Sequence, residues 1–269
     1  VVIVNVNPLS SERELLHQLS DAQVDTIVVL ENFASMIEIV YPKLSIQRVI
    51  VTKIGDPFPA IKGKLIDFAL KYIKRQIPSW KIPGCHYYHQ AMRVAKANQL
   101  RPATVFLEDM AFLQYTGGTT GLAKGAVLSH GNVLANIAQC LTWLKPWLDS
   151  GTDVVVTALP LYHIFSLTAC CFFMAIGVNA LLIPNPRDTS AFIKILKQNH
   201  FTVFLGLNTL FDKLLRHSGF PDIDFSALKL VFSGGMALQQ PVADRWKEQT
   251  GVNITEGYGL TETSPVVSI

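Results

Sequence analysis

From Val154 to Pro186 the chain contains no Asp, Glu, Lys or Arg, and this run limits the folds that the sequence can adopt. Residues 164–183 alone are about as long as a membrane-spanning helix, which needs about 20 apolar residues. Gly177 and Asn179 interrupt the run where a helix would turn into a strand, and Pro184 closes that strand. A buried helix of about a dozen residues followed by a short buried strand explains the pattern without lipid. We therefore interpret the run as part of a protein core.

The rest of the chain repeats this alternation of short apolar runs and helical patterns. Val154–Val156 and Leu181–Ile183 are continuous apolar runs, which are typical of strands covered on both faces, as in parallel sheets. Strands that alternate with helices predict an α/β fold, with largely parallel sheets covered by helices on both faces. The predicted strands are 1–6, 24–30, 46–52, 111–115, 153–158, 179–183, 202–205 and 229–232. The predicted helices are 11–20, 32–40, 61–77, 86–99, 131–142, 164–176, 188–199, 208–217 and 239–250.

The composition excludes several classes of protein. Charged residues make up 16% of the chain, against about 25% in a typical globular protein, so a disordered tail, a coiled coil and a collagen-like rod are excluded. The net charge of +3 is too small to predict nucleic-acid binding. The four cysteines form no CxxC pair, which predicts reduced thiols and a cytoplasmic protein.

The positive charge is concentrated in residues 60–101, which hold nine basic side chains and one acidic one, a local charge of +8. Within this stretch, 61–77 can form an amphipathic helix. A basic amphipathic helix can lie on an anionic membrane surface, and the alternative is a solvated outer helix. The expected apolar face consists of Leu65, Phe68, Ala69, Tyr72 and Ile73, and Lys64, Lys71, Lys74 and Arg75 lie largely off it.

The stretch Tyr115–Gly125 has the composition of a phosphate-binding loop. Glycines let backbone N–H groups approach an anion closely, threonine hydroxyls donate hydrogen bonds, and Lys124 adds positive charge. It is not a Walker A loop, because Lys124 precedes Gly125 and no Gly-Lys-Ser/Thr order is present. The alternative is a glycine-rich surface turn, which would not need three threonines and a lysine. The candidate residues are Tyr115, Thr116, Gly117, Gly118, Thr119, Thr120, Gly121 and Lys124.

A second candidate stretch is Glu256–Thr263. It is not a dinucleotide fingerprint, because Glu262 stands where the third glycine would be. Tyr258 offers an aromatic face to a base, Thr261 offers a hydroxyl to a phosphate, and Glu262 offers a hard oxygen ligand to Mg²⁺.

These two stretches, in this order, resemble the phosphate loop and the adenine motif of the acyl-adenylate-forming superfamily. Leu159–Phe165 looks like the motif at the mouth of that superfamily's acyl pocket, and Ser233–Met236 looks like its adenine-cradling turn. Within the superfamily the chain is most similar to the bacterial long-chain fatty-acid–CoA ligases. Gly118 and Ala123 depart from the residues that are common in the phosphate loop, but the loop works largely through backbone groups.

The resemblance implies a reaction in two halves: a fatty carboxylate attacks ATP to give acyl-adenylate, and the thiol of coenzyme A then displaces AMP. It implies that Thr116–Thr120 and Lys124 hold the β- and γ-phosphates as a lid, that Thr261 contacts the α-phosphate and that Glu262 binds Mg²⁺. It assigns the adenine to Gly235, Met236 and Tyr258, and it adds Gly259 as a nucleotide-binding residue. It assigns the acyl pocket to Gly206, Leu207, Gly234 and His163.

His163 has two interpretations. By resemblance it is a gate or a carboxylate-positioning group beside the acyl entrance, and the alternative is a core histidine bonded to the backbone. His86 and His89 do not predict a metal site, because no carboxylate or cysteine completes the set.

The resemblance also implies that residues 1–269 are part of a large adenylation domain, truncated at both ends, and that a small mobile C-terminal domain follows. Such a fragment is expected to be nearly inactive alone. The expected protein is cytoplasmic, with peripheral contact to the inner face of the membrane through 61–77, and its oligomeric state is not set. Two rival functions remain: an adenylate-forming ligase for a medium-chain, aryl or amino acid, and a non-catalytic membrane-associated module.

Overall fold

The computed structural model describes residues 1–95, 102–116, 122–149 and 151–269. The chain forms two compact units. The first unit contains Val1–Asn5, Phe106–Gln114 and Ala126–Ile269, and the second contains Val6–Val105 and Tyr115–Gly125. The boundary passes through a two-stranded sheet of β4 (Met110–Thr116) and β5 (Lys124–Ser129).

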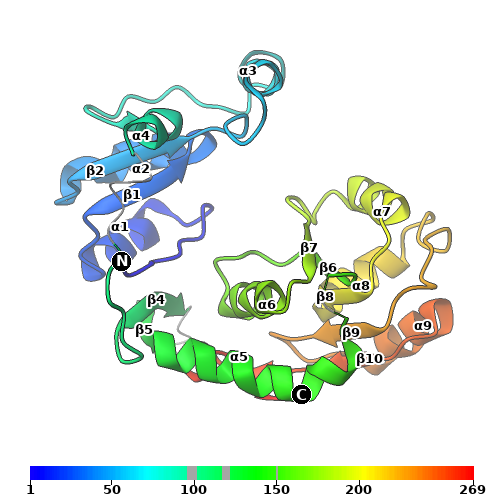
Figure 1. Cartoon of the computed structure of the whole chain (residues 1–269). Coiled ribbons are helices and arrows are strands. Elements are labelled where there is room, and N and C mark those ends of the chain that lie inside the picture. Colours follow the sequence, from blue (N-terminus) through cyan, green and yellow to red (C-terminus); the bar gives the residue numbers. More distant parts are fainter. Residues whose placement is uncertain (96–101, 117–121, 150) are drawn as a thin grey trace. The chain divides into compact units, whose positions relative to one another are not determined.

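The second unit is built on a parallel three-stranded sheet in the order β1-β2-β3 (Figure 1). Its first helix begins at a capping box, in which the Ser11 hydroxyl and the Glu14 carboxylate bond each other's backbone N–H groups. Leu15, Leu19 and Val51 lie in its apolar core. The elements are α1 (Glu12–Asp21), β1 (Thr26–Leu30), α2 (Ala34–Val40), β2 (Arg48–Thr52), α3 (Ala60–Phe68), β3 (His86–Tyr87) and α4 (Tyr88–Val94).

The first unit is built on a five-stranded sheet in the order β10-β9-β8-β6-β7, in which every neighbouring pair is parallel. The chain moves outward from β6 to β7, then crosses back to β8 and continues in the opposite direction. The strands are β6 (Val154–Thr157), β7 (Asn179–Leu182), β8 (Val203–Gly206), β9 (Leu230–Ser233) and β10 (Ile254–Glu256). The helices are α5 (His130–Leu144), α6 (Ile164–Ala175), α7 (Thr189–Gln198), α8 (Asn208–Leu215) and α9 (Gln240–Thr250).

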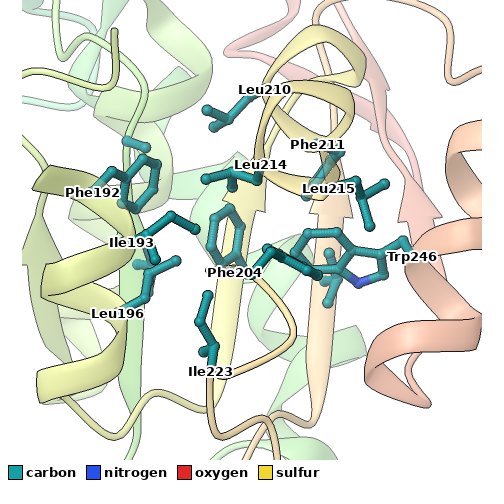
Figure 2. Packing of buried hydrophobic residues seen from close by; sticks show 14 of the residues in the cluster. Phe192, Ile193, Leu196, Phe204, Leu210, Phe211, Leu214, Leu215, Ile223 and Trp246 are labelled. Atoms are coloured by element: carbon teal, nitrogen blue, oxygen red, sulfur yellow. The ribbon is translucent and has the colours of Figure 1, made fainter. Parts of the chain in front are cut away.

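The reversal of direction places helices on both faces of this sheet, because parallel crossovers are right-handed. Side chains that alternate along each strand belong to two different clusters: Val156 and Phe204 pack with α7, α8 and α9, whereas Val155 and Leu205 pack with α5 and α6. Figure 2 shows the first cluster, with Phe204 among side chains from α7, α8 and α9. The predicted α/β class, with a mostly parallel sheet covered on both faces, is confirmed.

The uncharged run 154–186 folds as β6, α6 and β7. Val155, Val156, Phe172 and Phe173 are buried in it, and none of the helices in the described part of the chain is long and apolar enough to cross a membrane. The prediction that this run is core is therefore confirmed for β6 and α6. The predicted burial of the strand that follows was wrong, because β7 is the edge strand of the sheet and Asn179, Ala180 and Leu182 are exposed. All four cysteines are free.

Three predicted elements were wrong in part. Residues 1–6 do not form a strand: only Ile3 pairs, through a single parallel bridge to Phe112, and the side chains of Val1 to Ile3 are exposed. The predicted helix 86–99 begins at Tyr88, because His86 and Tyr87 pair with β2, and it ends at Val94. The predicted helix 61–77 continues from α3 as a π-helix, Ala69–Ile73, and ends before Arg75, whose φ of 50° is left-handed.

Candidate active site

The candidate residues of the first unit lie where the strands of its sheet end. Ser233–Met236 follows β9, Gly257–Glu262 follows β10, Leu159–Phe165 follows β6, and Gly206 ends β8. The strand ends are aligned, because Ser233 is in register with both Gly206 and Glu256. Ligands of open parallel sheets bind outside the carboxyl ends of the strands, at the point where the strand order reverses. The fold therefore brings these motifs, which are up to 100 residues apart, to one edge.

The turn Gly234–Gly235 is shaped by its neighbours. Gly234 donates its N–H to the Gly206 carbonyl over 3.3 Å, and a Cβ on Gly234 would lie 3.1 Å from the Phe165 ring. Gly235 has a φ of 81°, which favours glycine, and Met236 after it is exposed. The turn thus presents backbone and one apolar side chain to solvent, and its role toward adenine stays a prediction.

Two side chains that the sequence analysis missed hold the far end of this turn. The Glu256 carboxylate accepts a hydrogen bond from the Leu238 N–H over 3.1 Å. The buried Asn208 side chain accepts one from the Gln239 N–H over 2.9 Å. Asn208 directly follows Leu207 at the end of β8, so the turn after β9 is fastened to both neighbouring strands.

The segment after β10 is a hairpin. β11 (Tyr258–Gly259) pairs antiparallel with β12 (Val266–Ser268), and a 3-10 turn, Thr261–Thr263, lies between them. The Leu260 N–H donates to the Pro265 carbonyl over 3.0 Å, and a Cβ on Gly259 would lie 2.1 Å from that oxygen. Gly259 is therefore required for the hairpin to close.

The hairpin leaves its predicted functional side chains accessible. Tyr258 and Glu262 are exposed, and Thr261 is half-buried. The Glu262 carboxylate has no hydrogen-bond or ion-pair partner among the described residues. An unpaired, exposed carboxylate on an ordered turn fits the role of a hard oxygen ligand for a divalent cation.

His163 precedes the first residue of α6 and is not a core histidine. Its side chain is exposed and has no hydrogen-bond partner in the described part of the chain. Its ring lies 4.6 Å from the Tyr162 ring, measured between centroids. Desolvation by the surrounding protein atoms lowers the pKa of His163, so near neutral pH its imidazole is mainly uncharged.

The loop that carries His163 is attached to the strand that leads into the phosphate loop. Gln114 is buried in β4, and its side-chain amide donates to the Tyr162 carbonyl. The Asn5 amide donates in turn to Gln114 over 3.3 Å. A glutamine between apolar strand residues is a signal that sequence reasoning can use, because a buried amide needs partners.

A cavity of about 70 Å³ lies beneath these motifs on the α5–α6 face of the sheet. Its lining is almost wholly apolar, and it reaches from the helices to the end of β9 and into the hairpin. Gly234, Gly206 and Leu207 are not among its lining residues, although Ser233 and Phe165, their neighbours in sequence or space, are. Its lining includes Ile137, Cys140, Ala169, Pro265 and Val266.

The phosphate-loop candidates belong to the second unit, whereas the motifs described above belong to the first. Gly117–Gly121, which includes Thr119 and Thr120, lies outside the described residues. Before it, Thr116 is half-buried, and its hydroxyl lies 3.5 Å from the Lys124 carbonyl. After it, the Lys124 side chain is exposed and forms no ion pair with any described residue.

Helix α1 holds both sides of this loop, which the sequence analysis did not anticipate. The Tyr115 hydroxyl donates to the Asp21 carboxylate over 2.5 Å, and the His17 ring donates through Nε2 to the Ala123 carbonyl over 2.8 Å. Burial, followed by the hydrogen bond and the charge of Asp21, raises the pKa of Tyr115. Tyr115 therefore anchors the loop through its hydroxyl.

No three His, Cys, Asp or Glu side chains among the described residues gather as a metal-binding group. His89 stacks on Tyr87 with ring centroids 6.0 Å apart. A Mg²⁺ ion bound through one carboxylate and the phosphates of a nucleotide would not need such a group.

The whole chain, residues 1–269, matches the family described as AMP-binding enzyme, and the protein belongs to that family. Within it, the chain is 46% identical to a long-chain-fatty-acid–CoA ligase of Haemophilus influenzae and 47% identical to one of Escherichia coli O157:H7. A ligase of the same name from Bacillus subtilis is 34% identical over 98% of the chain. The first two alignments cover 100% of this chain and 48% of each relative, so the chain spans about half the length of the relatives it matches.

Solved structures share the fold. The anthranilate CoA ligase AuaEII in complex with anthranoyl-AMP matches 98% of this chain and 46% of its own, with a TM-score of 0.81 and 22% identity. A long-chain-fatty-acid-CoA ligase from Archaeoglobus fulgidus matches with a TM-score of 0.72 and 19% identity, over 98% of this chain and 48% of its own. At these identities the likeness establishes the fold alone.

Proposed function

We propose that the chain is part of an ATP-dependent long-chain fatty-acid–CoA ligase. Identity of 46–47% along the whole chain to ligases of that name carries the proposal. The arrangement of the motifs at one edge of a parallel sheet supports it. In this proposal residues 1–269 are part of the large adenylation domain, a small mobile domain lies beyond them, and the fragment alone is nearly inactive.

In the first half-reaction a carboxylate oxygen of the fatty acid attacks the α-phosphorus of ATP, and the bond to pyrophosphate breaks. Both reactants are anions, so catalysis requires positioning and charge neutralisation. Lys124 and the loop from Thr116 to Thr120 hold the β- and γ-phosphates, and Thr261 donates to the α-phosphate. Gly235, Met236 and Tyr258 hold the adenine, and Gly259 contributes to the nucleotide site. Glu262 would hold Mg²⁺, which neutralises phosphate charge when it is bound.

His163 serves as a positioning group for the carboxylate at the acyl entrance. Its lowered pKa keeps the imidazole mainly neutral near pH 7, so it can donate one hydrogen bond without a charge. In the second half-reaction the thiol of coenzyme A loses its proton and attacks the acyl carbonyl. The carbon–oxygen bond to AMP then breaks, which gives acyl-CoA and AMP.

The apolar cavity receives the start of the acyl chain, between Ala169 on α6 and Val266 on the hairpin. Each buried methylene contributes about 0.8 kcal/mol. In this proposal the cavity of about 70 Å³ takes only the first part of a long chain, and the rest enters when the surrounding side chains separate. Gly206, Leu207 and Gly234 form the upper rim of the pocket in this proposal.

The proposal is tested with the full-length enzyme by AMP release that depends on ATP and palmitate. Glu262→Ala and Lys124→Ala should each reduce fatty-acid-dependent pyrophosphate exchange by at least about 100-fold. Matched controls are Glu248→Ala and Lys247→Ala, which remove exposed charges of the same sign on α9 and should retain activity. Equal activity in the Glu262 and Glu248 variants would contradict the assigned role of Glu262.

A ligase for another carboxylic acid is the second candidate within the same chemistry. The feruloyl-CoA synthase of Amycolatopsis sp. is 28% identical over 61% of this chain. Pyrophosphate exchange with palmitate, octanoate, benzoate, ferulate and amino acids distinguishes the two. The proposal expects the highest kcat/KM with palmitate, and a higher value with an aryl acid would replace it.

We also propose that the protein is cytoplasmic and that α3, with the π-helix after it, rests on the anionic inner face of the membrane. This helix packs against the chain through Gly63, where a Cβ would lie 2.4 Å from the Gly55 carbonyl oxygen, and through Asp67, which accepts from the Gly55 N–H over 2.9 Å. The opposite side is apolar and open to solvent. Leu65, Phe68, Tyr72 and Ile73 are 56–71% exposed there.

Charge complementarity supports a lipid surface as the occupant of this face. Lys62, Lys64, Lys71, Lys74 and Arg75 are exposed around the apolar side chains, and the one acid of the helix, Asp67, faces inward. Apolar insertion together with basic charge is the usual requirement for interfacial binding.

Co-sedimentation with phosphatidylglycerol vesicles tests membrane contact. Phe68→Glu combined with Tyr72→Glu should reduce binding to these vesicles, and Lys194→Glu on α7 is a control for added acidity. Phosphatidylcholine vesicles should bind weakly. Retained binding by the double variant would contradict this site, and binding without any ATP- or palmitate-dependent activity would favour the non-catalytic module.

A further inference from the structure

Asn136, in the middle of α5, has the most fully bonded buried side-chain amide near the candidate site. It is 4% exposed. Its Nδ2 donates to the Val266 carbonyl over 2.8 Å, and its Oδ1 accepts from the Val266 N–H over 3.1 Å. Nδ2 also lies 3.2 Å from the Gln139 side-chain oxygen. The amide therefore bonds both backbone groups of one residue, as a neighbouring strand would.

Val266 is the first residue of β12, the returning strand of the hairpin that carries Tyr258, Thr261 and Glu262. Apart from Asn136, this hairpin is joined to the sheet where it leaves β10, by the Gly257 N–H bonded to the Ser233 carbonyl over 2.8 Å. Asn136 holds the other strand. The turn with Glu262 thus lies between two attachments, one to β9 and one to α5.

The second attachment also borders the cavity. Ile137 and Cys140 of α5 line it, as do Pro265 and Val266 of the hairpin. A chain that fills the cavity touches both sides of the Asn136 contact. Within the hairpin, the Thr263 hydroxyl accepts from the Leu260 N–H over 3.0 Å and lies 2.5 Å from the Pro265 carbonyl oxygen. Movement at Pro265 is therefore passed directly to the turn.

From this arrangement we propose that Asn136 is a positioning residue: it holds the Tyr258–Glu262 segment against α5 and couples occupation of the acyl cavity to nucleotide binding. The inference rests on the proposed function. It adds that fatty acid and nucleotide bind cooperatively, through a contact that touches neither ligand. Removing a group that orients a metal ligand typically costs about 10- to 100-fold in metal affinity or activity, and Glu262, the proposed Mg²⁺ ligand, lies on the segment that Asn136 holds.

The test compares full-length wild type with Asn136→Ala, and with Gln139→Ala as the matched control. Gln139→Ala removes only the exposed neighbour of the same amide. The measurements are the KM for ATP and the kcat in palmitate-dependent pyrophosphate exchange, and the dissociation constant of a non-hydrolysable ATP analogue with and without palmitate. In wild type, palmitate should tighten binding of the analogue.

Asn136→Ala should raise the KM for ATP about tenfold or more and abolish the effect of palmitate on analogue binding. Palmitate binding alone should change less than threefold. Gln139→Ala should behave as wild type. A merely structural role would lower the amount of folded enzyme without removing the coupling between the two ligands.

Asn136→Asp provides a second test if the alanine variant does not fold. It keeps the acceptor for the Val266 N–H and loses the donor to the Val266 carbonyl, so an intermediate defect is expected. Wild-type coupling in either folded variant would overturn the inference. Absence of palmitate-dependent exchange in the wild type would instead contradict the proposed function, so the two failures are distinguishable.

Discussion

The two faces of the five-stranded sheet are formed by the same strands, but their side chains are packed differently. On the face covered by α7, α8 and α9, Phe204, Phe211 and Trp246 are fully buried in an aromatic cluster. On the face covered by α5 and α6, the packing leaves a cavity of about 70 Å³. The same strands are thus fully packed on one face and leave a cavity on the other, and the difference comes from the helices that cover them.

The largest effect is expected on the fully packed face. Trp246→Ala should lower the free energy of unfolding of the sheet by about 3–5 kcal/mol. The reason is that the centroid of the indole lies within 6.1 Å of the centroids of four phenylalanine rings. Hydrogen exchange of the β8 and β9 amides measures this energy. Trp246→Phe keeps a ring and should cost less. The activity of the molecules that remain folded should be unchanged.

The second-largest effect is expected on the face that carries the cavity. Ala169→Phe places a ring in the cavity and should reduce kcat/KM for palmitate by about 10- to 100-fold, while the cost in stability is about 1–3 kcal/mol. Ala175→Phe, on the exposed end of the same helix, is the matched control. A palmitate kcat/KM that Ala169→Phe leaves unchanged would show that the acyl chain lies elsewhere.

A smaller, pH-dependent effect is expected at the start of β6, a strand whose side chains pack on both faces of the sheet. Asp153 precedes β6, and its carboxylate lies 3.1 Å from Lys229 Nζ and accepts from the Asp149 N–H. Burial by itself raises the pKa of Asp153, but the bond from Asp149 and the interaction with Lys229 lower it overall. A lowered pKa stabilises the fold above the ordinary value of 3.8, and this contribution is lost as the pH falls below it.

Urea unfolding of wild type and Asp153→Asn between pH 5 and 2.5 measures this contribution. The difference between them should shrink as the pH falls. Asp222→Asn is the control, because its ion pair with Lys197 is more exposed and should contribute little. A difference that grows toward low pH would contradict the sign of the shift.

The smallest effect compares one helix from each face. The Ser129 hydroxyl caps α5 and the Asp188 carboxylate caps α7, each by accepting a backbone N–H from three residues later. Replacing either by Ala should cost about 1 kcal/mol of stability. Only Ser129→Ala should also raise the KM for palmitate, since α5 lines the cavity. Equal effects on KM would weaken the distinction between the faces.

Local patterns predicted most of this sheet. The predicted strands 153–158 and 229–232 form as β6 (Val154–Thr157) and β9 (Leu230–Ser233), and all five helices that cover the sheet lie within two residues of their predicted bounds. The short strands β5, β10, β11 and β12 were not predicted, because glycines and polar residues weaken their alternation. Their pairing depends on partners that are distant in the chain.

The same limit applies to the candidate site. Thr261, Glu262 and Tyr258 were predicted because their side chains suit a phosphate, a cation and a base, and Met236 was predicted from the family resemblance; their roles stay predictions. The residues that hold them, such as Asn136 and Asn208, are single amides in ordinary helices, and their partners are 130 and 31 residues away. A side chain whose role is to bond a distant backbone leaves no local periodicity, so only its burial in the fold reveals it.

The aromatic cluster around Trp246 has an optical consequence. Trp143 and Trp147 are exposed and Trp80 is half-buried, so Trp246 is the one fully buried indole of the four. Its emission should be blue-shifted and resistant to quenching by iodide, and that of the others should be quenched. Intrinsic fluorescence in the presence of a quencher can therefore follow the integrity of the aromatic face of the sheet separately from the face that carries the cavity.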